Sequence, residues 1–178
     1  MALPIDAGVY PIDKVHSQLR FTVEHLDIAF IHGLFERFDG ELVVGEELDD
    51  TSAWIDVETA SINSASPFRD DALRGADWLD VDNHPLMTFR STTATAADDG
   101  YALTGDLSIK GTTLPVTFDI TYNGSAPFVF DGSTHFGFVG RAVIDRSAYG
   151  MTALMDMVGH DIELRLDLQF VRHTAATA

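Results

Sequence analysis

The residues whose types and spacing come closest to metal chemistry lie in the stretch RGADWLDVDNHP, residues 74–85. Its three Asp side chains supply carboxylate oxygens, the ligands that Ca²⁺ prefers. A calcium loop that began at Asp80 would need a Gly at its sixth position and a Glu at its twelfth, where the sequence has Pro85 and Ser91. The pattern therefore predicts no metal site in this stretch.

Histidine offers a second route to metal or acid–base chemistry. His16, His25 and His32 lie close together in the sequence, but no HExxH or comparable motif frames them. His25 alternates in step with Phe21 and Val23, so we expect its side chain on the same strand face as theirs. A hydrogen-bonded structural histidine at the end of a strand is the favoured interpretation.

The sequence offers no motif for covalent catalysis or for binding a nucleotide cofactor. The chain contains no Cys and no GxSxG motif, so the usual activated nucleophiles are missing. The glycines of GFVG, residues 137–140, lie within an expected strand and continue neither as GxGxxG nor as a Walker sequence. We therefore expect no catalytic residue, no metal and no cofactor.

The charge balance limits the kinds of partner that the protein is expected to bind. The net charge is −17, from 28 acidic against 11 basic residues, and such a surface repels phosphate backbones and anionic lipid headgroups. This excludes nucleic acid as the expected partner. The first residues, MALPIDAGVYPIDKVHS, lack a basic region before an apolar one, and no apolar run is long enough to span a membrane. We expect a cytoplasmic protein, or a periplasmic or secreted one if the N-terminus is processed.

The elements that must position these residues are almost all strands. QLRFTVEH, residues 18–25, and DIELRLDLQFV, residues 161–171, alternate apolar and polar side chains, the pattern of a strand with one buried and one wet face. Similar segments are expected at 34–44, 53–62, 86–95, 101–109, 113–122 and 135–144. Asp99-Gly100, Lys110-Gly111, Asn123-Gly124 and Asp131-Gly132 predict tight turns between strands.

Two segments interrupt the strand pattern. Residues 66–83 begin with Ser66 and Pro67, an N-cap and first-turn signature, and predict a short helix followed by a turn. Residues 147–159 carry three Met among other apolar side chains. About eight half-apolar strands need a cover that two short insertions cannot supply, so the sheet must close on itself. The predicted class is all-β with short helical insertions, an antiparallel, roughly eight-stranded lipocalin-like β-barrel.

Several sequence segments, in their order along the chain, resemble those of a known protein family. YPIDKVHSQLRFTVEHL and IHGLFERFDGEL are followed by SINSASPFRDDALRGADWLDVDNHPLMTFRST, LTGDLSIKGTTLPVTFDI and GFVGRAVIDRSAYGM. Together they resemble the YceI-like, lipocalin-like family of polyisoprenoid-binding proteins, from about Tyr10 to Phe170. The chain is therefore expected to be one such domain over residues 1–178, with its core at about 10–171.

The resemblance implies an apolar tunnel inside the barrel, a homodimer, and binding of a polyprenol, a polyprenyl phosphate or an isoprenoid quinone without catalysis. A co-purified lipid or quinone would then be a ligand rather than a cofactor, and no stable membrane insertion is expected. In this interpretation Trp78 and Leu79 close or line the tunnel, while Arg69, Asp70 and Arg146 hold the insertions onto the barrel.

Strand parity and the insertions together nominate the residues expected to contact ligand. They are Phe21, Val23, His25, Phe35, Phe38, Ile55, Val57, Trp78, Phe89, Leu107, Ile109, Val116, Phe118, Phe138, Tyr149, Met151, Leu154, Met155, Leu164 and Leu166. Trp78, Met151, Leu154 and Met155 would guard one end, and part of the set would be plain core.

Two other classes of function stay open at this point. One is an enzyme acting on a lipophilic substrate, with His25 or a buried acid as general base. The other is a dimeric, stress-related structural protein with a filled barrel. A titratable group deep in the tunnel would favour the first, and an interior without a continuous void would favour the second.

Overall fold

The computed structural model describes residues 3–172; residues 1–2 and 173–178 of the predicted 1–178 domain lie outside the described residues. Strands dominate the chain, as the alternating pattern predicted. They are β1 (Gly8–Pro11), β2 (Gln18–His25), β3 (Ala29–Phe35), β4 (Phe38–Val44), β5 (Ser52–Glu58), β6 (Ile62–Asn63), β7 (Leu86–Ala97), β8 (Gly100–Ile109), β9 (Thr112–Pro127), β10 (Thr134–Asp145) and β11 (Val158–Arg172). The helices are α1 (Pro67–Arg74) and three short 3-10 turns at Leu48–Asp50, Thr59–Ser61 and Arg146–Tyr149.

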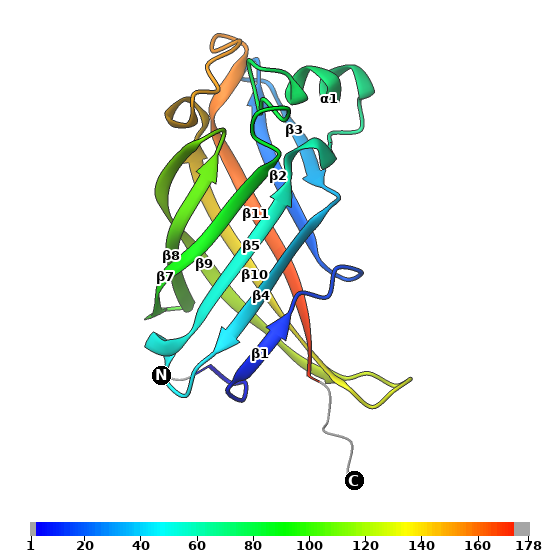
Figure 1. Cartoon of the computed structure of the whole chain (residues 1–178), viewed down its shortest axis with the longest axis vertical. Coiled ribbons are helices and arrows are strands. Elements are labelled where there is room, and N and C mark those ends of the chain that lie inside the picture. Colours follow the sequence, from blue (N-terminus) through cyan, green and yellow to red (C-terminus); the bar gives the residue numbers. More distant parts are fainter. Residues whose placement is uncertain (1–2, 173–178) are drawn as a thin grey trace.

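All strands form one antiparallel sheet in the order β1-β4-β5-β7-β8-β9-β10-β11-β2-β3-β6. Because β3 and β4 follow one another along the chain yet lie near opposite ends of this order, the sheet must curl round on itself, and Figure 1 shows the resulting barrel. Ile12 bridges to Phe170 of β11 while its amide donates to the Gly40 carbonyl of β4 at 3.0 Å. This segment joins the two sides, and the predicted fold class is confirmed.

The strand boundaries differ from the predicted ones in two places. The segment expected as one strand at 34–44 is divided between β3 and β4, because the backbone at Glu36 and Arg37 turns to bond Ser61 and Glu58 instead. With the short β1 and β6, this gives more strands than the predicted eight. Asn123-Gly124 is not a turn: it lies inside β9, where Gly124 pairs with Gly137 and the register shifts by a bulge before Phe138. Here the positive φ of Gly124 serves a bulge.

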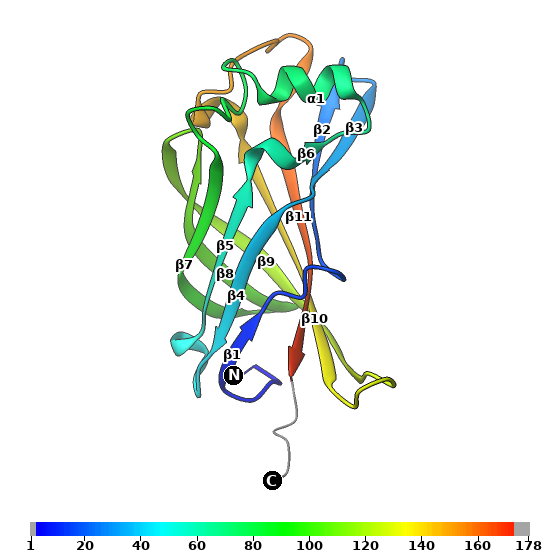
Figure 2. The ribbon, with the colours of Figure 1, turned by 45° about the vertical axis from the view of Figure 1, so that its right-hand side comes forward.

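Helix α1 crosses one end of the barrel, as Figure 2 shows, and the predicted N-terminus at Ser66 and Pro67 is confirmed. The Ser66 side chain makes no capping hydrogen bond. Instead, the buried carboxylate of Asp70 accepts hydrogen bonds from the backbone amide and the hydroxyl of Ser64, at 2.8 and 2.5 Å. Arg69 donates to the Ser64 hydroxyl and carbonyl from the other side. The start of the helix is therefore held to the preceding chain by an acidic and a basic side chain that each bond to Ser64.

The other half of the barrel lies towards the end where β11 finishes (Figure 1), and aromatic rings pack together there. Phe136 stacks on Phe170 with ring centroids 5.5 Å apart, and Tyr10 meets Phe136 edge to face at 5.0 Å. Phe138 contacts both Phe170 and Tyr122. Edge-to-face and offset contacts of this kind pack tightly, so this half of the interior is a dense core.

Candidate functional site

An apolar, partly open cavity lies in the half of the barrel that α1 covers. It is a cavity of about 390 Å³. Its lining is mostly apolar and consists of Phe21, Val23, His25, Ile31, Phe35, Ile62, Ser66, Phe68, Arg69, Ala72, Leu73, Trp78, Leu79, Met87, Ile109, Ile144, Arg146, Met151, Leu154, Val158, Ile162 and Leu164. A cavity of this size and character is typical of a site for a small lipophilic ligand.

One wall of the cavity is a row of β-branched side chains that runs across four neighbouring strands. Ile144 of β10 is opposite Ile162 of β11, Ile162 is opposite Val23 of β2, and Val23 is opposite Ile31 of β3. Directly paired residues point to the same face of a sheet, so the four form one continuous apolar surface. The wall follows directly from the register of the barrel.

The two insertions close the cavity from above. Leu73 of α1 and Trp78 and Leu79 just after it line the cavity, as do Met151 and Leu154 of the segment 150–157. Figure 1 places α1 and that segment at the same end of the barrel. The stretch around Trp78 therefore forms part of a cover for an apolar space.

A buried arginine organises the segment 150–157. Arg146 is completely buried, and its guanidinium donates to four backbone carbonyls: those of Met151, Ala153, Val158 and Gly159, at 2.5–2.9 Å. Burial lowers the pKa of this guanidinium, and the nearby Asp145 carboxylate partly offsets that. An arginine keeps its charge in proteins, so here the carbonyls compensate a charge removed from water.

Four polar side chains interrupt the apolar lining: His25, Ser66, Arg69 and Arg146. None of the lining residues is acidic, although acidic residues outnumber basic ones 28 to 11 in the whole chain. Arg69 is half-buried and has no carboxylate within ion-pair distance among residues 3–172. The cavity therefore offers positive charge to any polar group that a ligand carries.

Two smaller apolar voids lie elsewhere in the barrel interior. The first, of about 50 Å³, shares Phe35, Met87 and Leu164 with the main cavity and is otherwise bounded by side chains such as Phe89 and Phe118. The second, of about 70 Å³, lies beside Phe138. The interior space is thus divided by side chains, with most of it at the end that α1 covers.

The structure brings about half of the nominated residues to the main cavity. Those that line it are Phe21, Val23, His25, Phe35, Trp78, Ile109, Met151, Leu154 and Leu164. Those that border the first smaller void are Ile55, Val57, Phe89, Leu107, Phe118 and Leu166, while Phe138 borders the second. Four border none of these three spaces: Phe38, Val116, Tyr149 and Met155.

These four have different surroundings. Phe38 and Val116 are half-buried and pack against the core. Tyr149 is almost fully buried in the 3-10 turn, where burial raises the pKa of its hydroxyl and the oxygen has no hydrogen-bond partner among the described residues. Met155 is half-buried in the segment 150–157. The alternation of apolar and polar residues identified the inward face of the strands. It could not show which inward positions border empty space.

Several cavity residues were not nominated: Ile31, Ile62, Ser66, Phe68, Arg69, Ala72, Leu73, Met87, Ile144, Arg146, Val158 and Ile162. Leu79, which the family resemblance implied would close or line the tunnel, also lines the cavity. A signal existed for Ile162 and Ile144, because Ile162 extends the alternation that selected Leu164 and Ile144 extends the alternation that selected Phe138. Met87 likewise precedes Phe89 on the same strand face. The cavity residues of α1 and Arg146 could not have been identified from the sequence alone, because their position depends on where the insertions fold.

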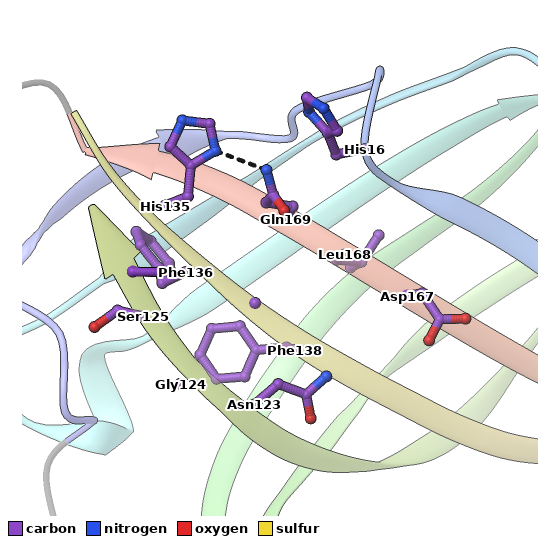
Figure 3. Close-up of a pocket in the computed structure, with 12 residues that line it drawn as sticks. His16, Asn123, Gly124, Ser125, His135, Phe136, Phe138, Asp167, Leu168 and Gln169 are labelled. Atoms are coloured by element: carbon purple, nitrogen blue, oxygen red, sulfur yellow. Dashed lines mark hydrogen bonds between the residues drawn. The ribbon is translucent and has the colours of Figure 1, made fainter. Parts of the chain in front are cut away.

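A second cavity, also of about 390 Å³, lies on β9, β10 and β11 towards the opposite end of the barrel (Figure 3). Gly124, Gly137 and the bulge residue Asn123 contribute to its lining. The imidazole of His135 is hydrogen-bonded to the Gln169 amide at 2.7 Å and to the Ser133 hydroxyl at 3.1 Å. Both ring nitrogens of His135 therefore have partners, and this space is more polar than the one under α1.

The residues that the structure describes provide no group of three or more His, Asp or Glu side chains placed to hold a metal ion. None of the helices within residues 3–172 is long and apolar enough to cross a membrane.

Comparison with known proteins identifies relatives over nearly the whole chain. Residues 10–170 match the model of the YceI-like domain family. A UPF0312 protein of Serratia proteamaculans is 30% identical over 171 residues, which cover 93% of this chain and 88% of the relative. A UPF0312 protein of Pseudomonas putida is 35% identical over 149 residues, which cover 82% of this chain and 77% of the relative.

Solved structures share the fold at lower identity. BcnA of Burkholderia cenocepacia superposes with a TM-score of 0.78 at 22% identity, covering 89% of this chain and 98% of BcnA. A polyisoprenoid binding domain from Saccharophagus degradans superposes with a TM-score of 0.65 at 11% identity, covering 93% of this chain and 98% of that domain. These similarities support the barrel architecture.

Proposed function

This chain belongs to the YceI-like family, and from that membership and the shape of its interior we propose that it binds an isoprenoid-type lipid in the cavity under α1. The ligand class comprises polyprenols, polyprenyl phosphates and isoprenoid quinones. The observation that carries the proposal is the cavity of about 390 Å³ with its apolar wall and its cover of two insertions. The solved polyisoprenoid binding domain of similar fold supports the same class of ligand.

The binding free energy would come mainly from removing the lipid chain from water. Each buried methylene contributes about 0.8 kcal/mol, so one five-carbon isoprene unit contributes about 4 kcal/mol before the costs of ordering and association. A wall of Ile and Val side chains makes non-directional contacts with a ligand. Such a wall selects ligands by the width and length of their chains more than by chemical detail. A protein of this kind retains whichever lipid of suitable shape its host supplies.

The polar residues of the lining support a position for the headgroup at the covered end of the barrel. Arg69 already donates from Nε and Nη2 to Ser64, at 2.7 and 2.6 Å, and its remaining donors are directed to no carboxylate of residues 3–172. A guanidinium matches phosphate in charge and geometry. A polyprenyl phosphate would therefore gain an interaction here that a polyprenol lacks.

We favour binding without catalysis over an enzyme on a lipophilic substrate. His25 is the only histidine in the cavity lining, and the lining contains no Asp, Glu or Cys. A catalytic base is normally oriented by a further group, and the His25 ring has no hydrogen-bond or ion-pair partner within the described part of the chain. The main cavity in turn argues against the filled-barrel structural protein.

Carriage or sequestration of the lipid is the role that fits one covered cavity in a single binding domain. A homodimer and a cytoplasmic location remain predictions from the sequence and the family resemblance. Analytical ultracentrifugation of the lipid-loaded protein tests the dimer, and fractionation of the native host tests the location. Neither prediction is needed for lipid binding to the cavity.

The decisive experiment is mass spectrometry of the purified full chain, first under native conditions and then on an organic extract. We expect a co-purifying species of isoprenoid mass, or uptake of one equivalent when the protein is incubated with farnesol, solanesol or a ubiquinone. An apo mass that stays unchanged after all three incubations would contradict the proposal.

A further inference from the structure

We propose that the end of the barrel that carries α1 docks onto the surface of a zwitterionic lipid bilayer, and that the ligand passes directly between this bilayer and the cavity. The docking stands on exposed side chains, whereas the passage of ligand rests on the proposed function. The contact is shallow and reversible, because single side chains from turns and one short helix make it.

Three separate elements present large apolar side chains to solvent at this end. They are the turn between β2 and β3 with the start of β3, helix α1, and the segment 150–157, which Figure 2 places together. The exposed side chains, which we call the docking face, are Leu26, Ile28, Phe30, Phe68, Leu154 and Met157. Apolar side chains that gather at one end of a molecule, rather than being scattered singly, mark a contact surface.

Backbone hydrogen bonds join two parts of the docking face. The Leu26 amide donates to the Met157 carbonyl at 2.8 Å, and the Met157 amide donates to the Leu154 carbonyl at 3.0 Å. The pairing of Val158 with His25 continues this contact into the sheet. The turn between β2 and β3 and the segment 150–157 therefore belong to one surface.

The backbone holds two of these leucines in a conformation that favours glycine or asparagine. The φ angles of Leu26 and Leu154 are 56° and 51°. A leucine is disfavoured there, because its Cβ crowds the backbone. A turn that only connected β2 to β3 would have Gly or Asn at such a position. Leucine at both positions indicates that the exposed apolar side chain itself is needed.

The docking face is continuous with the cavity. Phe68 and Leu154 line the cavity while being 89% and 56% exposed, so each borders both the ligand space and the solvent. A lipid that left a bilayer at this point would move from one apolar environment to another without crossing water. This continuity favours a bilayer as the partner over a protein that would cover the entrance.

The charges among these side chains select the kind of bilayer. Asp27 in the turn and Asp156 in the segment 150–157 are both exposed, and neither the turn nor that segment contains Lys or Arg. In α1 the cationic Arg69 is half-buried. A zwitterionic headgroup presents an ammonium group to the two carboxylates, whereas an anionic headgroup is repelled by them. Docking should therefore weaken as anionic lipid is added.

The docking is tested with a fluorescent label on the full chain, which contains no cysteine of its own. Ile28→Cys and Val15→Cys each carry one nitrobenzoxadiazole group, whose emission rises in an apolar environment. Ile28 and Val15 are 83% and 84% exposed and lie beyond opposite ends of β2, so Val15 is the matched control. With phosphatidylcholine vesicles we expect the emission to rise about twofold or more at position 28 and to stay constant at position 15.

Two further changes act on the same signal. Phe30→Glu, at an exposed position outside the cavity lining, should raise the vesicle concentration for half-maximal emission at position 28 by about fivefold or more. Replacing a quarter of the phosphatidylcholine by phosphatidylglycerol should weaken docking at low salt, and added salt should reverse that loss.

The passage of ligand is tested by the rate at which the solanesol-loaded protein transfers solanesol to phosphatidylcholine vesicles, separated by flotation and extracted. Transfer by contact makes the rate proportional to vesicle concentration, whereas release through water makes it independent of that concentration. Ile28→Glu should slow transfer by about fivefold or more without changing how much solanesol the protein holds, because Ile28 does not line the cavity.

The outcomes distinguish this inference from the proposed function. A label at position 28 that responds to vesicles no more than one at position 15 overturns the docking, whatever the cavity binds. A response at position 28 to unlabelled protein without vesicles assigns this end to a second copy and overturns it too. A transfer rate independent of vesicle concentration overturns the passage and leaves lipid binding intact. If the protein takes up neither solanesol nor any other isoprenoid, the proposed function and the passage fail together, and the vesicle titration still decides the docking.

Discussion

The guanidinium carbon of Arg146 lies over the ring of Trp78, 4.9 Å from its centroid. This contact joins the two insertions, since Trp78 follows α1 and Arg146 begins the 3-10 turn after β10. The same guanidinium binds four carbonyls around the segment 150–157. A cation over an indole face is attracted by the ring in addition to its packing contacts. One buried charge therefore couples both parts of the cavity cover.

Replacing Arg146 should loosen that cover and destabilise the protein. Arg146→Met leaves the carbonyls of Met151, Ala153 and Val158 without their donor, and we expect a loss of about 3 kcal/mol or more in the free energy of unfolding. Arg146→Lys should recover only a small part, because an ammonium cannot reproduce the planar fork. Urea unfolding at neutral pH measures both. A loss within about 0.5 kcal/mol for Arg146→Met would show that the carbonyls find other donors.

A charge placed inside the cavity should abolish lipid retention. Leu73→Glu puts a carboxylate at a half-buried position among apolar side chains of the cover, where a lipid bound in the cavity would remove the charge from water. Leu86→Glu makes the same chemical change at a leucine that is 48% exposed and outside the cavity lining, so it is the matched control. Mass spectrometry of organic extracts should show lipid with the control and none with Leu73→Glu. Equal retention by both variants would place the ligand elsewhere.

Arg69 should distinguish phosphorylated ligands from alcohols. Arg69→Leu removes the half-buried cation of the lining, so we expect farnesyl phosphate to bind about tenfold or more weakly while farnesol binding changes by less than about threefold. Isothermal titration calorimetry with both ligands gives the comparison, and circular dichroism checks that the loss of the Ser64 contacts leaves the fold intact. An equal loss for both ligands would assign Arg69 to the structure of the cover alone.

Gly105 should tolerate no side chain. A Cβ atom there would lie 2.4 Å from the backbone oxygen of Arg90 and 2.6 Å from Cζ of Phe89, so the Phe89 ring rests directly against the glycine. We expect Gly105→Ala to lower the free energy of unfolding by about 1–3 kcal/mol. Gly137→Ala, where the nearest atom to the added carbon is 3.4 Å away, should change it by less than about 0.5 kcal/mol. Thermal unfolding of the two variants makes the comparison, and equal melting temperatures would disprove the contact.

The Asp167 carboxylate should contribute to stability only above its titration range. The hydrogen bond from Arg165 lowers its pKa from the usual 3.8, with Arg20 acting in the same direction and burial opposing both. A lowered folded-state pKa stabilises the protein above the unfolded value, and that contribution disappears as the pH falls through the folded one. We expect Asp167→Asn to lose up to about 1 kcal/mol at pH 7, because the pair is partly exposed, and nothing near pH 2. Urea unfolding at both pH values measures this, and a constant difference would contradict it.

The strand class and the inward faces were predictable because period-two alternation is a local property. The alternation around Leu164 and Leu166 shows which face is apolar, and the same logic placed Phe21 and Val23 correctly on the inward face. The division between β3 and β4 was not predictable in this way. It depends on Glu36 and Arg37 bonding to a segment more than twenty residues away, which no local pattern shows.

The cavity cover was predictable in outline and not in detail. The apolar residues of 66–83 and 147–159 had no place in an alternating strand, so a covering role followed from their composition. Arg146 as the residue that joins the two insertions depended on tertiary contacts with Met151, Ala153 and Trp78. Asn123-Gly124 shows the reverse case: it is a turn-like pair inside a long strand, where the positive φ of Gly124 serves a bulge.

The pairing of Ile12 with Phe170 has a consequence for synthesis on the ribosome. The segment next to β1 and the last strand, β11, meet across almost the whole length of the chain, and β2 also pairs with β11. Contacts of such high sequence separation form late, so the emerging chain must keep the edge of β2 unpaired until β11 has left the exit tunnel. A net charge of −17 keeps the incomplete sheets of neighbouring chains apart during that interval. The acidic composition thus protects a fold that its final strand completes.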